Sequence, residues 1–86
     1  MTTMIIFHEV DDVAHWLAST KRTEVFGSRG ISIRTFVDPA KTNRVGLIAE
    51  IPDMAVFQAL MASPEAAEAM KLDGVRPATL VALVQS

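Results

Sequence analysis

The sequence contains no cysteine, so disulfides, thiol nucleophiles and thiolate metal sites are excluded. No apolar run approaches the ~18 residues that a membrane helix needs. The start of the chain lacks the basic residues and the long apolar stretch of a signal peptide. Eight Lys and Arg against ten Asp and Glu give a net charge of −2, which argues against nucleic acid or an anionic membrane as a partner. These absences predict a cytoplasmic protein with no nucleic-acid and no membrane partner.

Apolar residues, by contrast, are abundant and make up 50% of the 86 residues. A chain of this length forms one domain and buries only roughly 60–65% of the surface that it exposes when unfolded. A single small core cannot hide so much apolar material. We therefore expect one domain over residues 1–86, with part of the apolar surplus in a contact between identical subunits.

Hydrophobic periodicity and turn signals predict four strands, at residues 4–10, 31–37, 45–51 and 79–84. An apolar stripe predicts one helix from about residue 13 to residue 22, with an extension through residue 26 left open. A second helical region is expected at 54–61 and again after Ser63-Pro64-Glu65, with Gly74 as its stop. This order of elements is the ferredoxin-like βαββαβ pattern of the α+β class. It predicts an antiparallel sheet with the first and third strands in the centre and the helices on one face.

Alternation along the strands separates two faces of this sheet. We assign the helices to the face that carries Met4, Ile6 and His8, and in the last strand Thr79, Val81 and Leu83. The other face keeps apolar side chains that water should not contact, which predicts a homodimer packed sheet against sheet. The predicted dimer contact consists of Phe7, Glu9, Arg34, Phe36, Ile48 and Glu50.

The three charges in that contact persist in an interface only when they are paired. We expect Arg34 to meet Glu50 across the hairpin, or a carboxylate of the other subunit. If the two faces are exchanged, Glu9, Arg34 and Glu50 instead form a cluster inside a cavity, where an arginine suits a carboxylate.

Turn and packing residues along the whole chain resemble those of small members of the dimeric α/β-barrel superfamily. They are Val10-Asp11-Asp12 with Trp16, Gly30-Ile31, Asp38-Pro39, Ile51-Pro52-Asp53, Ser63-Pro64-Glu65 with Met70, and Gly74-Val75. The resemblance implies a ferredoxin-like domain that closes a barrel with a second copy. The superfamily includes cofactor-independent antibiotic-biosynthesis monooxygenases, polyketide cyclases, haem-degrading monooxygenases and muconolactone isomerase, and fold alone does not choose among them. Haem-degrading members use an Asn in the first strand and a His on the second helix. Both are missing here, so we expect no cofactor.

His8 is the candidate catalytic residue, because it lies near the end of a central strand where superfamily members tend to have their cavity. An imidazole there could move a proton or orient a substrate oxygen near neutral pH. The alternative is a structural histidine bonded to a backbone carbonyl or water. We expect His8, Trp16, Phe57 and Met61 to bind a small apolar or aromatic molecule between sheet and helices. The place of Trp16 in the apolar stripe favours the role of packing anchor of the first helix, and the two roles are compatible.

The remaining polar residues carry no recognisable chemistry. His8 and His15 lie on different elements without a recurring ligand spacing, so no metal site is predicted. Arg22 and the other scattered basic residues are expected on a solvated surface. We favour a homodimer that binds a small ligand. A cofactor-independent monooxygenase, cyclase or isomerase acting on an aromatic or polyketide-like substrate, and a purely structural interaction module, remain alternatives.

Overall fold

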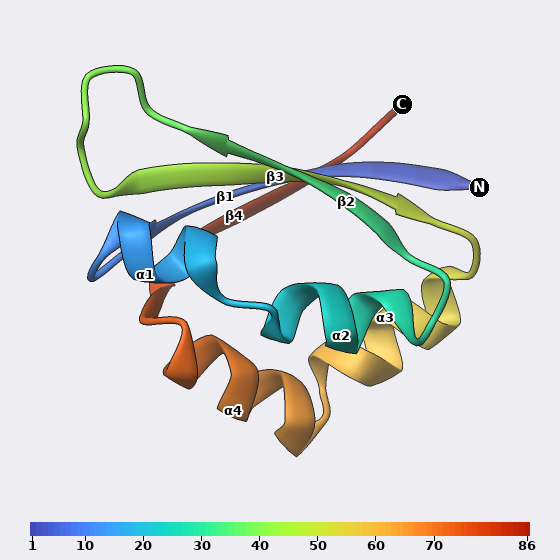
Figure 1. The fold of residues 1–86 in the computed structure, drawn as a ribbon. Helices are drawn as coiled ribbons and strands as arrows, with labels where there is room; N and C mark the ends of the chain where they lie inside the picture. Colours follow the sequence, from blue (N-terminus) through green and yellow to red (C-terminus); the bar gives the residue numbers. More distant parts are fainter.

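The chain forms a four-stranded antiparallel sheet with four short helices on one face (Figure 1). The computed structural model describes residues 1–86. The elements in order are β1 (Thr2–Val10), α1 (Val13–Ala18), α2 (Lys21–Gly27), β2 (Ser32–Val37), β3 (Arg44–Ile51), α3 (Met54–Met61), α4 (Pro64–Leu72) and β4 (Val75–Val84). The strand order β2-β3-β1-β4 places the first and third strands in the centre, and the predicted ferredoxin-like fold is confirmed. No helix combines the length and the apolar character that a membrane crossing requires.

The second helical region follows its local signals closely. The Asp53 side chain accepts a hydrogen bond from the Ala55 N–H at 2.9 Å, and α3 begins there. The Ser63 side chain accepts from the Ala66 N–H at 3.3 Å, with Pro64 in the first turn of α4. Gly74 follows the end of α4 with φ +72°, a left-handed conformation that glycine adopts without steric cost. These caps fix both helices without help from distant residues.

The prediction of one continuous first helix is wrong, because the region breaks into α1 and α2 at Ser19 and Thr20. Ser19 is extended, with φ −70° and ψ 134°, and its N–H bonds back to the last turn of α1. The Arg22 guanidinium donates a 2.8 Å hydrogen bond from Nη1 to the Trp16 carbonyl, which the break leaves without its helical partner. Arg22 therefore lies in the first turn of a new helix and not at the end of the old one.

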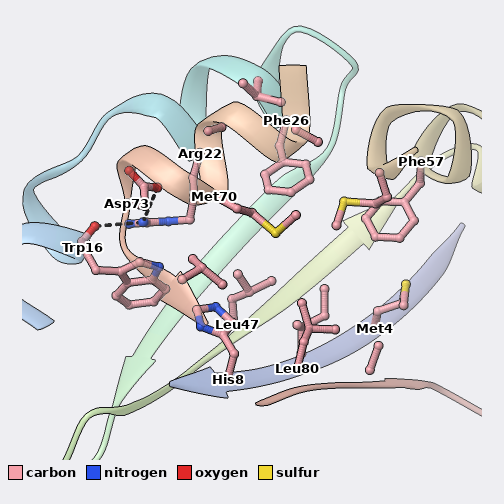
Figure 2. A pocket seen from close by; sticks show the side chains of 17 residues that line it. Met4, His8, Trp16, Arg22, Phe26, Leu47, Phe57, Met70, Asp73 and Leu80 are labelled. Carbon is pink, nitrogen blue, oxygen red and sulfur yellow. Dashed lines mark hydrogen bonds and ion pairs between the residues drawn. The ribbon is translucent and has the colours of Figure 1, made fainter. Parts of the chain in front are cut away.

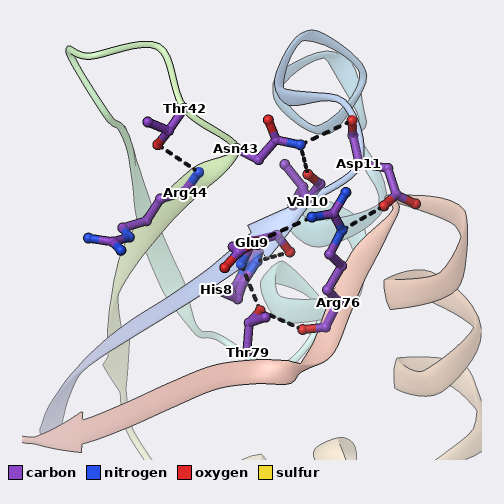
Figure 3. Close-up of polar contacts among 9 residues, drawn as sticks. All are labelled: His8, Glu9, Val10, Asp11, Thr42, Asn43, Arg44, Arg76 and Thr79. Carbon is purple, nitrogen blue, oxygen red and sulfur yellow. Dashed lines mark hydrogen bonds and ion pairs between the residues drawn. The ribbon is translucent and has the colours of Figure 1, made fainter.

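A bulge interrupts the pairing of β4 with the end of β1 (Figure 3). Between the pairs Glu9–Arg76 and Phe7–Val81, one residue of β1 faces four residues of β4. The Thr79 hydroxyl fills the gap: it accepts from the Glu9 N–H at 2.8 Å and donates to the Arg76 carbonyl at 2.7 Å. A threonine side chain here takes the place of missing ladder bonds.

This bulge makes the predicted orientation of β4 wrong. Val81 and Leu83 lie on the uncovered face and are 52% and 55% exposed. Leu80 and Ala82 instead turn toward the helices and line the cavity described below. Residues 80–84 are apolar on both faces, so their alternation carried no information about register.

The hydrophobic core lies between the sheet and the helices. Val10, Trp16, Val45 and Ile51 are its largest fully buried side chains. The opposite side of the sheet, here called the uncovered face, carries Ile5, Phe7, Phe36, Ile48, Val81 and Leu83 among Glu9, Arg34 and Glu50. No other part of the chain packs on it (Figure 1).

Candidate ligand cavity

A cavity of about 250 Å³ lies between the sheet and the helix layer. Its lining is hydrophobic at 14 of 17 residues and comes from β1, β3, β4 and all four helices. The polar exceptions are His8, Arg22 and Asp73, and Figure 2 shows them together at the Trp16 end of the cavity. All four predicted ligand-binding residues, His8, Trp16, Phe57 and Met61, lie in this lining. Their binding of a ligand stays a prediction.

His8 lies on the inner side of the central strand β1 and is only 5% exposed. The rings of His8 and Trp16 form a T-shaped pair, with 5.7 Å between the centroids and 79° between the planes. Nδ1 lies 3.4 Å from the Glu9 carbonyl oxygen, a long contact that favours a proton on Nδ1. The other nitrogen, Nε2, then carries the lone pair, and no group of the chain hydrogen-bonds to it.

The environment of His8 favours its neutral form. Burial lowers the pKa of His8 below its ordinary value of 6.5, because a charged imidazole loses hydration there. The Glu9 carbonyl acts in the opposite direction, and the positive charge of Arg22 lowers the pKa further. At neutral pH the cavity therefore contains an uncharged imidazole.

The structure corrects the expectation that Arg22 lies on a solvated surface. Its side chain is 12% exposed, and its Nη1 lies 3.4 Å from Oδ2 of Asp73, whose side chain is 4% exposed. The guanidinium Cζ sits 4.1 Å from the centroid of the Trp16 ring, a cation–π arrangement. Trp16 is therefore both the packing anchor of α1 and part of the cavity wall.

Sequence reasoning missed Arg22 and Asp73 because their partners are distant along the chain. Asp73 follows α4, 51 residues after Arg22. The sole local signal for the break was the pair Ser19-Thr20, because both residue types disfavour the interior of a helix. A break at this pair would have placed Arg22 in a new helix. Desolvation lowers the pKa of Arg22, while the charge and hydrogen bond of Asp73 raise it.

The other candidate residues lie outside the cavity. Arg34 Nη2 meets Glu50 Oε1 at 3.6 Å across the hairpin on the uncovered face, which is one of the two pairings that the sequence left open for Arg34. Glu9 instead pairs with Arg76 at 3.2 Å, beside the bulge (Figure 3). The inverted arrangement, with these charges inside the cavity, is thus wrong. His15 Nε2 lies 2.8 Å from the Leu72 carbonyl oxygen, away from His8.

By sequence, the chain matches no protein-family model and no curated protein. Solved structures share its fold at low identity. SnoaB, a cofactor-independent oxygenase from Streptomyces nogalater, superposes with a TM-score of 0.71 at 20% identity, covering 99% of this chain and 90% of SnoaB. An antibiotic biosynthesis monooxygenase gives 0.67 at 16% identity, covering 100% of this chain and 97% of that one. A dimeric protein of unknown function with a ferredoxin-like fold, from Bacteroides fragilis, gives 0.58 at 15% identity over 99% of this chain and 94% of that one. At these identities the similarity establishes the ferredoxin-like fold and no particular chemistry.

Proposed function

We propose that this protein is a homodimer that binds a small, mainly apolar aromatic molecule in the cavity between sheet and helices. The observation that carries this proposal is the lining, which is apolar except for three residues gathered at one end. Ligand sites commonly combine apolar walls with a few convergent polar groups that orient the ligand. A purely structural module would gain stability by filling such a space, since an unfilled apolar cavity is destabilising.

The volume of the cavity limits the size of the ligand. An engineered apolar cavity of about 150 Å³ holds benzene. The space here, about 250 Å³, is larger by roughly two thirds and suits a two-ring molecule. The ring edges and faces of Trp16, Phe26 and Phe57 offer aromatic contacts on its walls.

Calorimetric titration with naphthalene tests this proposal, with a matched pair of variants on α4. Ala69 lines the cavity, whereas Ala67 on the same helix is exposed. We expect Ala69→Leu to weaken naphthalene binding at least about tenfold because the added carbons occupy the ligand space. Ala67→Leu should bind as the parent does. Absence of naphthalene binding to the parent, or equal loss in both variants, would contradict the proposal.

The homodimer rests on the uncovered face. Its large apolar side chains Ile5, Phe7, Phe36, Val81 and Leu83 are 38–55% exposed in the single chain. Exposed apolar patches of this kind mark contact sites. The Phe7 ring lies over Gly46, where an added Cβ would come within 3.3 Å of Phe7 Cδ1. Because Gly46 has no side chain, the Phe7 ring can lie close to the backbone at the centre of this face. A similarity of fold to solved dimeric ferredoxin-like proteins supports a second copy as the partner.

The neutral His8 supports a second candidate, cofactor-independent catalysis that begins with removal of a ligand proton. His8 Nε2 would take the proton from an acidic C–H or O–H, and the negative charge would remain delocalised on the aromatic ligand. Isomerases, cyclases and cofactor-independent oxygenases can share such a first step.

This candidate has a test that requires no second reactant: exchange of the acidic C–H hydrogens of 2-tetralone for deuterium in D₂O, followed by NMR. We expect the parent to accelerate exchange and His8→Gln to lose about 100-fold or more of that acceleration. His15→Gln, which alters a histidine outside the cavity, should exchange at the parent rate. Equal rates for the parent and His8→Gln would exclude His8 as the base.

A further inference from the structure

We propose that the indole N–H of Trp16 and the Nε–H of Arg22 form a two-donor subsite for an uncharged carbonyl oxygen of the ligand. This inference rests on the proposed function, since it assumes an aromatic occupant of the cavity. It adds the chemical class of that occupant: an aromatic ketone, aldehyde, quinone or amide, and not a bare hydrocarbon or a carboxylate.

The first argument is that both donors are buried and no group of the chain accepts a hydrogen bond from either. Buried N–H groups almost always have an acceptor, and an unsatisfied one costs about 1–3 kcal/mol. Trp16 is 0% exposed, so bulk water does not serve its N–H. Two such atoms in one chain of this size require an explanation.

The second argument is that the two donors lie at the same end of the cavity. The Arg22 Cζ lies over the indole ring at 4.1 Å from its centroid, so the side chains that carry the two N–H groups are in contact. Both residues line the cavity. Figure 2 shows the Trp16 ring and the Arg22 side chain one above the other beside His8 and Asp73. A carbonyl oxygen has two lone pairs and can accept from both donors.

The third argument concerns charge. Asp73 already neutralises Arg22 at 3.4 Å, and Arg22 is further held by the Trp16 carbonyl through Nη1. A ligand carboxylate would enter close to the buried Asp73 carboxylate without a free cation to balance it, which is unfavourable in a cavity with apolar walls. A neutral carbonyl avoids this repulsion. In this arrangement Asp73 acts as a positioning residue for Arg22.

Naphthalene and two of its derivatives of similar shape, 2-acetylnaphthalene and 2-naphthoate, separate the possibilities by calorimetry. We expect 2-acetylnaphthalene to bind about tenfold or more tightly than naphthalene, because two donors gain an acceptor. We expect 2-naphthoate to bind more weakly than 2-acetylnaphthalene. Equal affinities for naphthalene and 2-acetylnaphthalene, or a preference for 2-naphthoate, would overturn the inference.

Variants assign any preference to the two donors. Trp16→Phe keeps an aromatic ring without the N–H, and Arg22→Lys keeps the charge near Asp73 without Nε. Each should reduce the ratio of the 2-acetylnaphthalene and naphthalene affinities about threefold or more while naphthalene still binds. Arg29→Lys is the control, since Arg29 pairs with Glu65 at 2.9 Å and does not line the cavity. An unchanged ratio in both Trp16→Phe and Arg22→Lys would overturn the inference.

These measurements distinguish failure of the subsite from failure of the proposed function. Binding of naphthalene without a carbonyl preference leaves the ligand cavity standing and removes the two-donor subsite. If none of the three compounds binds, the proposed function itself is refuted, and the subsite with it.

Discussion

Removing the charge of Asp73 should destabilise the protein far more than removing any surface charge. In Asp73→Asn the side chain keeps its shape, but the Arg22 guanidinium, 12% exposed, loses its only counter-ion. Breaking a buried ion pair on one side typically costs 3–5 kcal/mol. The Trp16 carbonyl at 2.8 Å and the indole face at 4.1 Å still hold Arg22, so we expect a loss near the lower end, about 3 kcal/mol. That is a large share of the roughly 4–13 kcal/mol expected for a domain of this size.

Urea unfolding provides the assay, because Trp16 is the only tryptophan and the chain has no tyrosine. Its emission, together with circular dichroism of the backbone, gives the free energy of unfolding. Glu24→Gln is the matched control, since its pair with Lys21 spans 3.9 Å at 52% and 62% exposure. We expect that variant to lose less than about 1 kcal/mol.

A double variant tests the physical reason for the loss. Arg22→Met combined with Asp73→Leu removes both charges and should recover most of the stability lost in Asp73→Asn, because apolar side chains need no counter-ion. If Asp73→Asn loses no more than Glu24→Gln, or the double variant is no better than Asp73→Asn, the buried pair does not behave as described.

Three further predictions follow from the structure. Because burial lowers the pKa of His8, protonation favours the unfolded chain. The stability that neutral His8 permits should be fully present above about pH 6.5 and lost as the pH falls toward the folded-state pKa of His8. The fall in melting temperature between pH 7.5 and 5.5 should therefore be smaller in His8→Gln than in the parent. An equal fall in the two proteins would contradict this prediction. Phe36→Glu places a charge on the uncovered face and should raise the dissociation constant of the dimer about tenfold or more in sedimentation equilibrium. The equally exposed Leu72 on α4 supplies the control Leu72→Glu, and a monomeric parent would refute the dimer. Thr79→Val leaves the Glu9 N–H and the Arg76 carbonyl without their 2.8 Å and 2.7 Å bonds and should cost about 1–3 kcal/mol in urea unfolding. Thr35→Val, at an exposed position of β2, should be nearly neutral, and equal losses in the two would argue against the role of Thr79.

The order and type of the strands and the second helical region were determined by the sequence alone. Asp53, Ser63 and Pro64 act on N–H groups within one turn of themselves, so the starts of α3 and α4 are local properties. The alternation along β1 and β3 likewise identified the buried side of the central strands and placed His8 on it. Trp16, Phe57 and Met61 could be placed near His8 because ferredoxin-like topology brings their helices over that side of the sheet.

Tertiary contacts decided the rest, because they join residues too distant along the chain to influence one another locally. The break between α1 and α2 is tied to Arg22, whose partners are the Trp16 carbonyl and Asp73. The register of β4 depends on Thr79, which bonds to Glu9, 70 residues away. A run that is apolar on both faces cannot signal its own register. The polar end of the cavity exists only where Trp16, Arg22 and Asp73 are brought together by folding, so its two unpaired donors could not have been found from the sequence.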